Sequence, residues 1–380
     1  MAASVGWQTL RDLAGFRAEK GLAVSLYLAL DPRDTPTAAD ADTRINSLLN
    51  EAERLAEAGR RDLTHEQRQA LKEDFGRIRR YFDEDFDRDG TRGLAVFSAP
   101  LDNFWSTLPL EDAAGTDIKI GREFYVAPLV PLLAKGGGAI VAFVSRERGD
   151  LYRLRAGRLH EVADLSDEVP GRHDQGGWSQ ARFQRHIDEQ AAEHWRRVAD
   201  ELNRRWRRLN GPPVVVAASE ELRSEFEELL AHETRAALAG WVSAEAHATP
   251  AELLEQALPV LEEWRARRER ELLERWQEEA GRNGRAASGW SDTLEAASDG
   301  RVECLLFAEG VDREAWQCPS CGRAAAASGN CPLDGTRMER RAEGIDLAVH
   351  QALAHGGTVW AVRFHAELDS ADGIGAILRY

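Results

Sequence analysis

Short apolar runs alternate along this chain with longer stretches in which apolar and charged residues are interleaved. The apolar runs have the length of buried strands, and they fall at residues 22–30, 139–144, 213–218 and 302–307. The interleaved stretches repeat apolar residues every three or four positions, which predicts helices over residues 40–82, from the glycine-rich segment to about 209, and over 250–281. The pattern therefore predicts an α/β fold (α+β overall), with helices covering sheets.

Weaker signals complete the expected elements. Residues 150–155 alternate, and Ala156-Gly157 would turn them into a hairpin with the run after Arg158. Further strands are expected at 93–99, 118–126 and 359–362 and at the apolar C-terminus, with a helix at 345–355.

The length of the chain, 380 residues, is too great for one compact core. Pro128, Pro131 and the glycines 136–138 form one break, and residues 282–285 form another. We therefore expect three domains: an N-terminal α/β domain (1–127), a middle domain (128–281) and a C-terminal α/β domain (282–380).

Composition indicates a soluble globular protein, with 43% hydrophobic and 30% charged residues. No apolar run approaches the roughly 20 residues that span a bilayer, and the first residues lack a secretion signal. We expect a cytoplasmic protein without a membrane partner.

The charge is unevenly distributed. The net charge of −16 is unfavourable for contact with RNA, but residues 171–210 hold nine Arg against six acidic residues. Two interpretations stay open: a cationic face that directs binding, or an ordinary solvated helix.

Two adjacent glycines, Gly176 and Gly177, stand between the break at Pro170 and the start of a long helical pattern. Without a Cβ, the backbone there can approach another molecule closely, and the helix start offers unpaired N–H groups to an anion. Two glycines alone are also typical of a simple turn.

The residues around the glycines favour a specific family. Gly176, Gly177, Ser179, Arg182 and Phe183 fall at positions that match the loop of the middle domain of the archaeo-eukaryotic class-one peptide chain release factors. The chain therefore resembles a bacterial relative of that family, akin to ribosome-quality-control peptidyl-tRNA hydrolases. Over roughly two thirds of the chain, this resemblance implies a ribonuclease H-like middle domain and a C-terminal α/β sandwich.

The resemblance also implies an activity, namely hydrolysis of peptidyl-tRNA in the ribosomal A site. In the family, a Gln directly after the glycines enters the peptidyl-transferase centre and helps to position water. This chain has Trp178 at that place and Gln180 two residues later. The expected catalytic residues are Gly176, Gly177 and Gln180, and the expected RNA-binding residues are His173, Trp178, Ser179, Arg182 and Arg185.

The expected partners are the ribosome with its RNA, peptidyl-tRNA and a translational GTPase. The first-domain Asn-Ile-Lys-Ser signature of stop-codon decoding is absent, so rescue fits better than normal termination. A second hypothesis stays open: a non-catalytic stress or hibernation factor that occupies the A site, because Trp178 would stack on a base more readily than it would position water.

The cysteines suggest a metal site. Cys318-Pro-Ser-Cys321-Gly and Cys331-Pro-Leu-Asp334-Gly resemble the two halves of a zinc ribbon, inserted at residues 316–338. The fourth ligand would be Asp334, or Cys304 if its strand lies alongside. Either a structural zinc ion is bound or the motif is a metal-free remnant held by packing. No organic cofactor is expected, since no phosphate-binding loop follows a strand.

Overall fold

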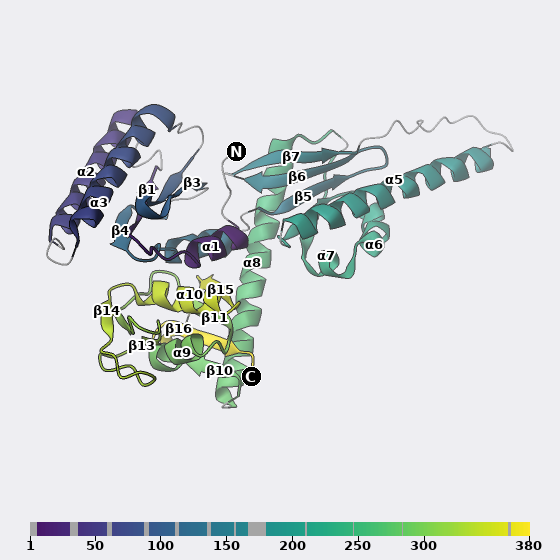
Figure 1. Cartoon of the computed structure of the whole chain (residues 1–380). Helices are drawn as coiled ribbons and strands as arrows, with labels where there is room; N and C mark the ends of the chain where they lie inside the picture. Colours follow the sequence, from purple (N-terminus) through teal and green to yellow (C-terminus); the bar gives the residue numbers. More distant parts are fainter. Residues whose placement is uncertain are drawn as a thin grey trace. The chain divides into compact units, whose positions relative to one another are not determined.

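The computed structural model of the chain describes residues 6–30, 37–58, 63–86, 91–110, 114–134, 138–155, 157–165, 180–209, 211–245, 247–282, 284–363 and 366–380. Within them, the side chains of 38–39, 55–58 and 180–188 are not described. The chain divides into two compact units, Lys135–Arg267 and a first unit that joins Met1–Ala134 to Arg268–Tyr380 (Figure 1). Each unit contains both helices and sheets, as the pattern predicts, while the proposed boundaries at 127 and 281 stay a prediction.

The second unit is built on one five-stranded sheet in the order β7-β6-β5-β8-β9. Its strands are β5 (Ile140–Val144), β6 (Gly149–Arg155), β7 (Arg158–Asp164), β8 (Val214–Ala217) and β9 (Leu238–Val242). Strands β5, β6 and β7 run antiparallel, whereas β5, β8 and β9 are parallel. The predicted hairpin at 150–155 is thus confirmed.

Helices cover both faces of this sheet, which explains why β5 and β8 are apolar at every position. Helices α5 (Gln180–Arg208) and α6 (Glu220–Leu229) pack on one face, and the first part of α8 (Pro250–Gly281) packs on the other. Alternate residues of β5 divide between the two cores: Ile140 and Ala142 face α5, and Val141 and Phe143 face α8. The short α7 (His232–Ala236) precedes β9.

The first unit begins with a four-stranded antiparallel sheet in the order β3-β2-β1-β4. The strands are β1 (Ala23–Ala29), β2 (Gly93–Ala99), β3 (Phe104–Leu110) and β4 (Asp117–Gly121), and the helices are α1 (Trp7–Ala14), α2 (Ala38–Ala58), α3 (His65–Arg80) and the short α4 (Val130–Ala134). The predicted helical stretch 40–82 is two helices, because Thr64 and Gln67 form a capping box that starts α3. The expected strand 118–126 ends at Gly121.

The C-terminal part of the first unit holds a sheet in the order β10-β16-β11-β15. Its strands are β10 (Ala286–Ser288), β11 (Val302–Ala308), β15 (Thr358–Val362) and β16 (Ile374–Leu378), with helices α9 (Gly289–Ser298) and α10 (Gly344–Ala354). The end of α8 packs through Trp276 on the side of β11 that carries Cys304 and Leu306. A separate small sheet, β13 (Ala324–Ala325), β12 (Ala315–Gln317) and β14 (Glu339–Arg341), forms the cysteine-bearing insert.

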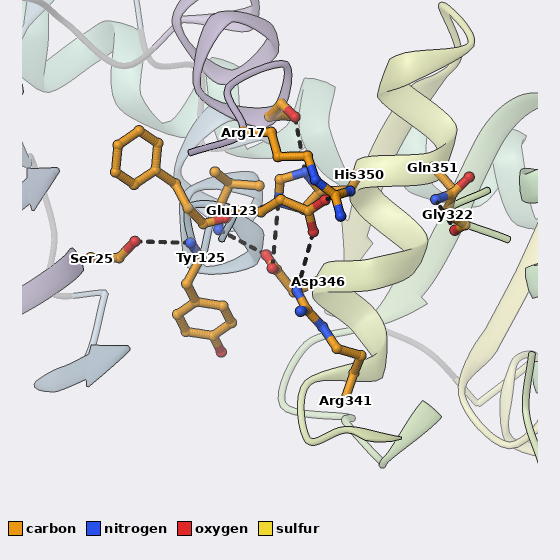
Figure 2. A network of polar contacts seen from close by, with 12 residues as sticks. Arg17, Ser25, Glu123, Tyr125, Gly322, Arg341, Asp346, His350 and Gln351 are labelled. Carbon is orange, nitrogen blue, oxygen red and sulfur yellow. Dashed lines mark hydrogen bonds and ion pairs between the residues drawn. The ribbon is translucent and has the colours of Figure 1, made fainter. Parts of the chain in front are cut away.

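A buried histidine on α10 joins the two sequence segments of the first unit (Figure 2). His350 is 6% exposed, and its Nδ1 and Nε2 lie 2.9 and 2.8 Å from the carbonyl oxygens of Ala14 and Phe124. Because a carbonyl oxygen only accepts hydrogen bonds, both ring nitrogens must carry protons. Burial acts to lower the pKa of His350, but the neighbouring Asp346 carboxylate outweighs it and raises the pKa to about 9.

Two carboxylates extend this contact. Asp346, 3.5 Å from His350 Nε2, accepts hydrogen bonds from the backbone N–H groups of Val126 (2.7 Å) and Ala127 (2.9 Å). Glu123 accepts hydrogen bonds from two arginines, Arg17 (2.9 Å) and Arg341 (3.1 Å). The segment after β4 is therefore held to α10 by Asp346 and to β14 by Arg341, both more than 200 residues away in sequence.

Candidate functional site

The cysteine-bearing insert brings together four side chains that could hold a metal ion. The ligand atoms of Cys318, Cys321, Cys331 and Asp334 all lie within 4.8 Å of one another. The Sγ atoms of Cys321 and Cys331 are 3.5 Å apart, and Cys318 Sγ lies 3.5 Å from Asp334 Oδ2. Four thiolates around zinc at about 2.3 Å stand about 3.8 Å apart, so these distances suit a tetrahedral ion.

Two tight turns create this geometry. Gly322 N–H donates to the carbonyl of Cys318, and Gly335 N–H donates to the carbonyl of Cys331, each at 2.9 Å. Both glycines have positive φ, +80° and +74°, which a side chain would strain. The two turns share the same hydrogen bond and the same glycine conformation, while the zinc ribbon itself stays a prediction.

Backbone N–H groups in the turns favour negative charge on two of the four ligands. Burial acts to raise the pKa of Cys318, but N–H donors at Cys321 and Ser320 outweigh it, so the pKa is lowered. The N–H of Thr336, 2.9 Å from Asp334 Oδ1, lowers the pKa of that carboxyl. The turns therefore favour the ionised forms of Cys318 and Asp334, the forms that bind a cation.

Cys304 does not join this group. It lies on β11 in a core cluster with Leu306 and Trp276. Among the described residues, the group of side chains that could hold a metal ion does not include it. Asp334 is therefore the fourth candidate ligand. The insert itself is tied to α10, because Gln351 Nε2 donates to the carbonyl of Gly322 (2.9 Å).

The glycine loop falls in a part of the chain that the structure does not describe. His173, Gly176, Gly177, Trp178 and Ser179 lie outside the described residues. Gln180, Arg182 and Arg185 belong to the first turns of α5, where the backbone alone is described. Helix α5 begins at Gln180, as the sequence pattern predicts, and the roles of the side chains in the glycine loop stay predictions.

The described part of α5 separates apolar and basic residues onto two faces. Its buried side chains recur every three or four positions and pack on the sheet: Ala191, His194, Val198 and Leu202. Burial lowers the pKa of His194, which favours the neutral form of this buried ring. The cationic pairs noted in the sequence, residues 196–197, 204–205 and 207–208, are exposed or half-buried.

These arginines differ in whether they form an ion pair. Arg204 and Arg205 both pair with Glu201, whose side chain is 11% exposed. Arg196, Arg207 and Arg208 form no hydrogen bond or ion pair with another described residue. Local pairing thus neutralises part of the sequence's positive patch and leaves three exposed cations along about 18 Å of helix.

Two features of the structure were not predicted from the sequence. The first is the buried pair of Asp346 and His350, although their i, i+4 spacing within a predicted helix was a signal that could have indicated it. The second feature, a cavity beside Trp195, has no local signal, since its lining residues come from four separate segments.

The sequence of the chain is similar to the sequences of known proteins. Residues 125–262 match the family model described as bacterial archaeo-eukaryotic release factor family 10. The chain is 28% identical over 284 residues to peptide chain release factor subunit 1 of Archaeoglobus fulgidus, covering 68% of this chain and 69% of that protein. The protein of the same description from Thermococcus kodakarensis is 25% identical over 251 residues, with 60% of each chain covered.

Solved structures give looser similarity. An archaeal translation termination factor, aRF1, superposes with a TM-score of 0.28 and 18% identity, covering 99% of this chain and 98% of that one. Dom34 of S. cerevisiae gives a TM-score of 0.39 and 12% identity, with 78% of this chain and 81% of that one covered. Among the helices of the described ranges, none is long and apolar enough to cross a membrane.

Proposed function

We propose that this chain, which is a bacterial relative of the archaeo-eukaryotic peptide chain release factors, is a ribosome-associated release or rescue factor. The observation that carries the proposal is the match over residues 125–262, because that range contains the two glycines and all of α5. Within that range, Ser179, Arg182 and Phe183 stand at the family's positions after the two glycines. The lack of the Asn-Ile-Lys-Ser signature favours rescue over stop-codon termination.

The proposed reaction is hydrolysis of the ester that joins the peptide to the terminal ribose of tRNA. Gly176 and Gly177 would let the main chain enter a crowded RNA site. Gln180 would orient the attacking water, and Arg182 with Arg185 would contact RNA phosphates. His173, Trp178 and Ser179 would lie against RNA.

Helix α5 suits the task of holding such a loop. The helix has 29 residues, about 43 Å at 1.5 Å per residue, and its apolar side is buried against the sheet through Val198 and Leu202. A loop anchored at its end on a packed helix loses less conformational entropy when it binds. Ribosomal RNA would supply most of the transition-state stabilisation, so we expect the isolated protein to be inert.

The test is release of labelled peptide from stalled ribosome complexes. Gln180→Ala and Gly177→Ala should each slow release at least about tenfold, because the first removes the side chain that would orient water and the second adds a Cβ where the main chain must approach RNA closely. Gln256→Ala is the matched control, as Gln256 is an exposed residue of α8. Release at the wild-type rate in both loop variants would remove the hydrolytic function.

Trp178 favours a second candidate, a non-catalytic factor that occupies the A site in stress or hibernation. An indole directly after the glycines would stack on a base, which strengthens binding without positioning water. In this case ribosomes would bind the chain without peptide release, and Trp178→Ala would weaken co-sedimentation. A translational GTPase as the delivering partner stays a prediction.

We further propose that Cys318, Cys321, Cys331 and Asp334 hold a structural zinc ion. The donor set of three thiolates and one carboxylate and the 3.5 Å spacings fit a tetrahedral site. With four protein ligands, the ion would have no open position for substrate, so its contribution would be to the folding of the insert. Elemental analysis of protein purified without chelator should find one zinc per chain, and Cys318→Ser should abolish it.

A further inference from the structure

A cavity of about 340 Å³ opens in the second unit at the carboxyl ends of β5 and β8. This volume lies within the range of small-molecule sites, about 300–1,000 Å³. The chain leaves β5 toward β6 and leaves β8 toward β9, in opposite directions across the sheet. In open α/β sheets, ligands bind where neighbouring strands part in this way.

The interior of the cavity is apolar and carries an indole. Phe143, Val144 and Leu222 are buried and belong to the two cores of the unit. Trp195 of α5 is half-buried, and its indole N–H donates to the carbonyl of Ser145 (2.9 Å), which fixes the ring. A fixed aromatic wall over an apolar floor favours a flat aromatic ligand.

Hydrogen-bond acceptors face the same cavity. Glu221 and Glu225 stand one turn apart on α6, both are exposed, and neither forms a hydrogen bond or ion pair with another described residue. Ser219 occupies the N-cap of α6, yet its hydroxyl makes no capping bond. These carboxylates and this hydroxyl are thus available to a ligand that donates.

One cation lines the cavity together with these acceptors. Arg146 is exposed and belongs to the lining. Its guanidinium group can face a negative group of the ligand. The ligand should therefore combine an aromatic ring, N–H donors and a negative group.

We propose that this cavity binds a guanine nucleotide, either free or as an unpaired residue of RNA. The base would lie against Trp195, and its adjacent N1–H and N2–H groups would donate to the carboxylate of Glu221 or Glu225. Guanine is favoured because adenine, cytosine and uracil do not present two adjacent N–H donors to one carboxylate. The phosphate would face Arg146, so recognition rests on the base and needs no phosphate-binding loop.

Binding to this cavity can be measured without ribosomes, so its outcome is separate from that of the peptide-release assay. Titration calorimetry of the full chain with GMP, AMP and UMP should show binding of GMP at least about tenfold tighter than that of the other two. Glu221→Gln or Glu225→Gln should weaken GMP binding about tenfold. Glu228→Gln, the same change at an exposed position of α6 outside the cavity, should leave it unchanged.

A second arm identifies the source of the base. An RNA hairpin with one bulged G that binds far tighter than GMP points to RNA, whereas equal affinities point to the free nucleotide. Trp195→Leu should weaken both by about tenfold or more, with the melting temperature as the check on folding. Absence of GMP binding, equal binding of the three nucleotides, or preference for an arginine-rich peptide would each overturn the proposal.

Discussion

Replacing His350 tests how the two sequence segments of the first unit are held together. Its two ring nitrogens donate to the carbonyls of Ala14 and Phe124, and Asp346 balances its charge. In His350→Ala, both buried carbonyl oxygens lose their donor and the Asp346 carboxylate loses its counter-charge. Truncating one partner of a buried ion pair costs about 3–5 kcal/mol.

The pKa gives an independent magnitude. Asp346 raises the pKa of His350 to about 9, against 6.5 for an ordinary histidine. A rise of about 2.5 units corresponds to about 3 kcal/mol, since one unit is 1.36 kcal/mol. Because the folded pKa is raised, this stability is fully present below pH 6.5 and is lost as the pH rises through 9.

Urea unfolding at pH 6 and at pH 9.5 separates these effects. The wild type should lose about 3 kcal/mol from this group between the two values, and His350→Ala should lose none of it. His355→Ala is the matched control, because His355 is exposed at the end of the same helix. Parallel pH profiles for wild type and His350→Ala, or a cost below about 1 kcal/mol at pH 6, would refute a charged histidine at this position.

Three further substitutions follow from the structure. Asp74 is buried with one carboxylate oxygen unpartnered among the described residues, and burial raises its pKa to about 6 despite the hydrogen bond from Ser98. Asp74→Asn should therefore stabilise the protein by up to about 3 kcal/mol above pH 6 in urea unfolding, and this gain should vanish near pH 4; a loss at pH 7.5 would contradict it. Gly149→Ala should destabilise by about 1–3 kcal/mol, because the new Cβ would lie 2.3 Å from Val198 Cγ2; an unchanged melting temperature would show that the helix can shift. Asp334→Cys should slow removal of zinc by chelator, since thiolate binds zinc more strongly than carboxylate, and faster removal would argue against Asp334 as a ligand.

Strands and helices with strong local patterns were predictable. The runs at 139–144 and 213–218 contain β5 and β8, and every residue of these two strands is buried between two helical layers. The helix predicted at 250–281 is α8, with the same bounds. The apolar residues within each segment determine these elements, so the sequence of one segment is enough to predict its strand or helix.

Other elements could not be predicted from the apolar pattern of a single segment. Strand β3 includes Pro109, which argues against a central strand; the sheet tolerates it because β3 lies at the edge. The division of residues 40–82 into α2 and α3 depends on the capping box at Thr64 and Gln67, a pattern of only four residues.

The candidate sites also divide into features that the sequence predicted and features that required the tertiary structure. Cysteine spacing and two glycines gave the metal-ligand group, because each half is a local turn of five residues. Tertiary structure alone excluded Cys304 by placing it in a different core cluster from Cys318 and Cys331. It alone also joined His350 to carbonyls 226 and 336 residues away and set Trp195 beside Glu221. Local backbone preference and turn chemistry act over a few residues, whereas buried charges and cavities arise only where distant segments pack together.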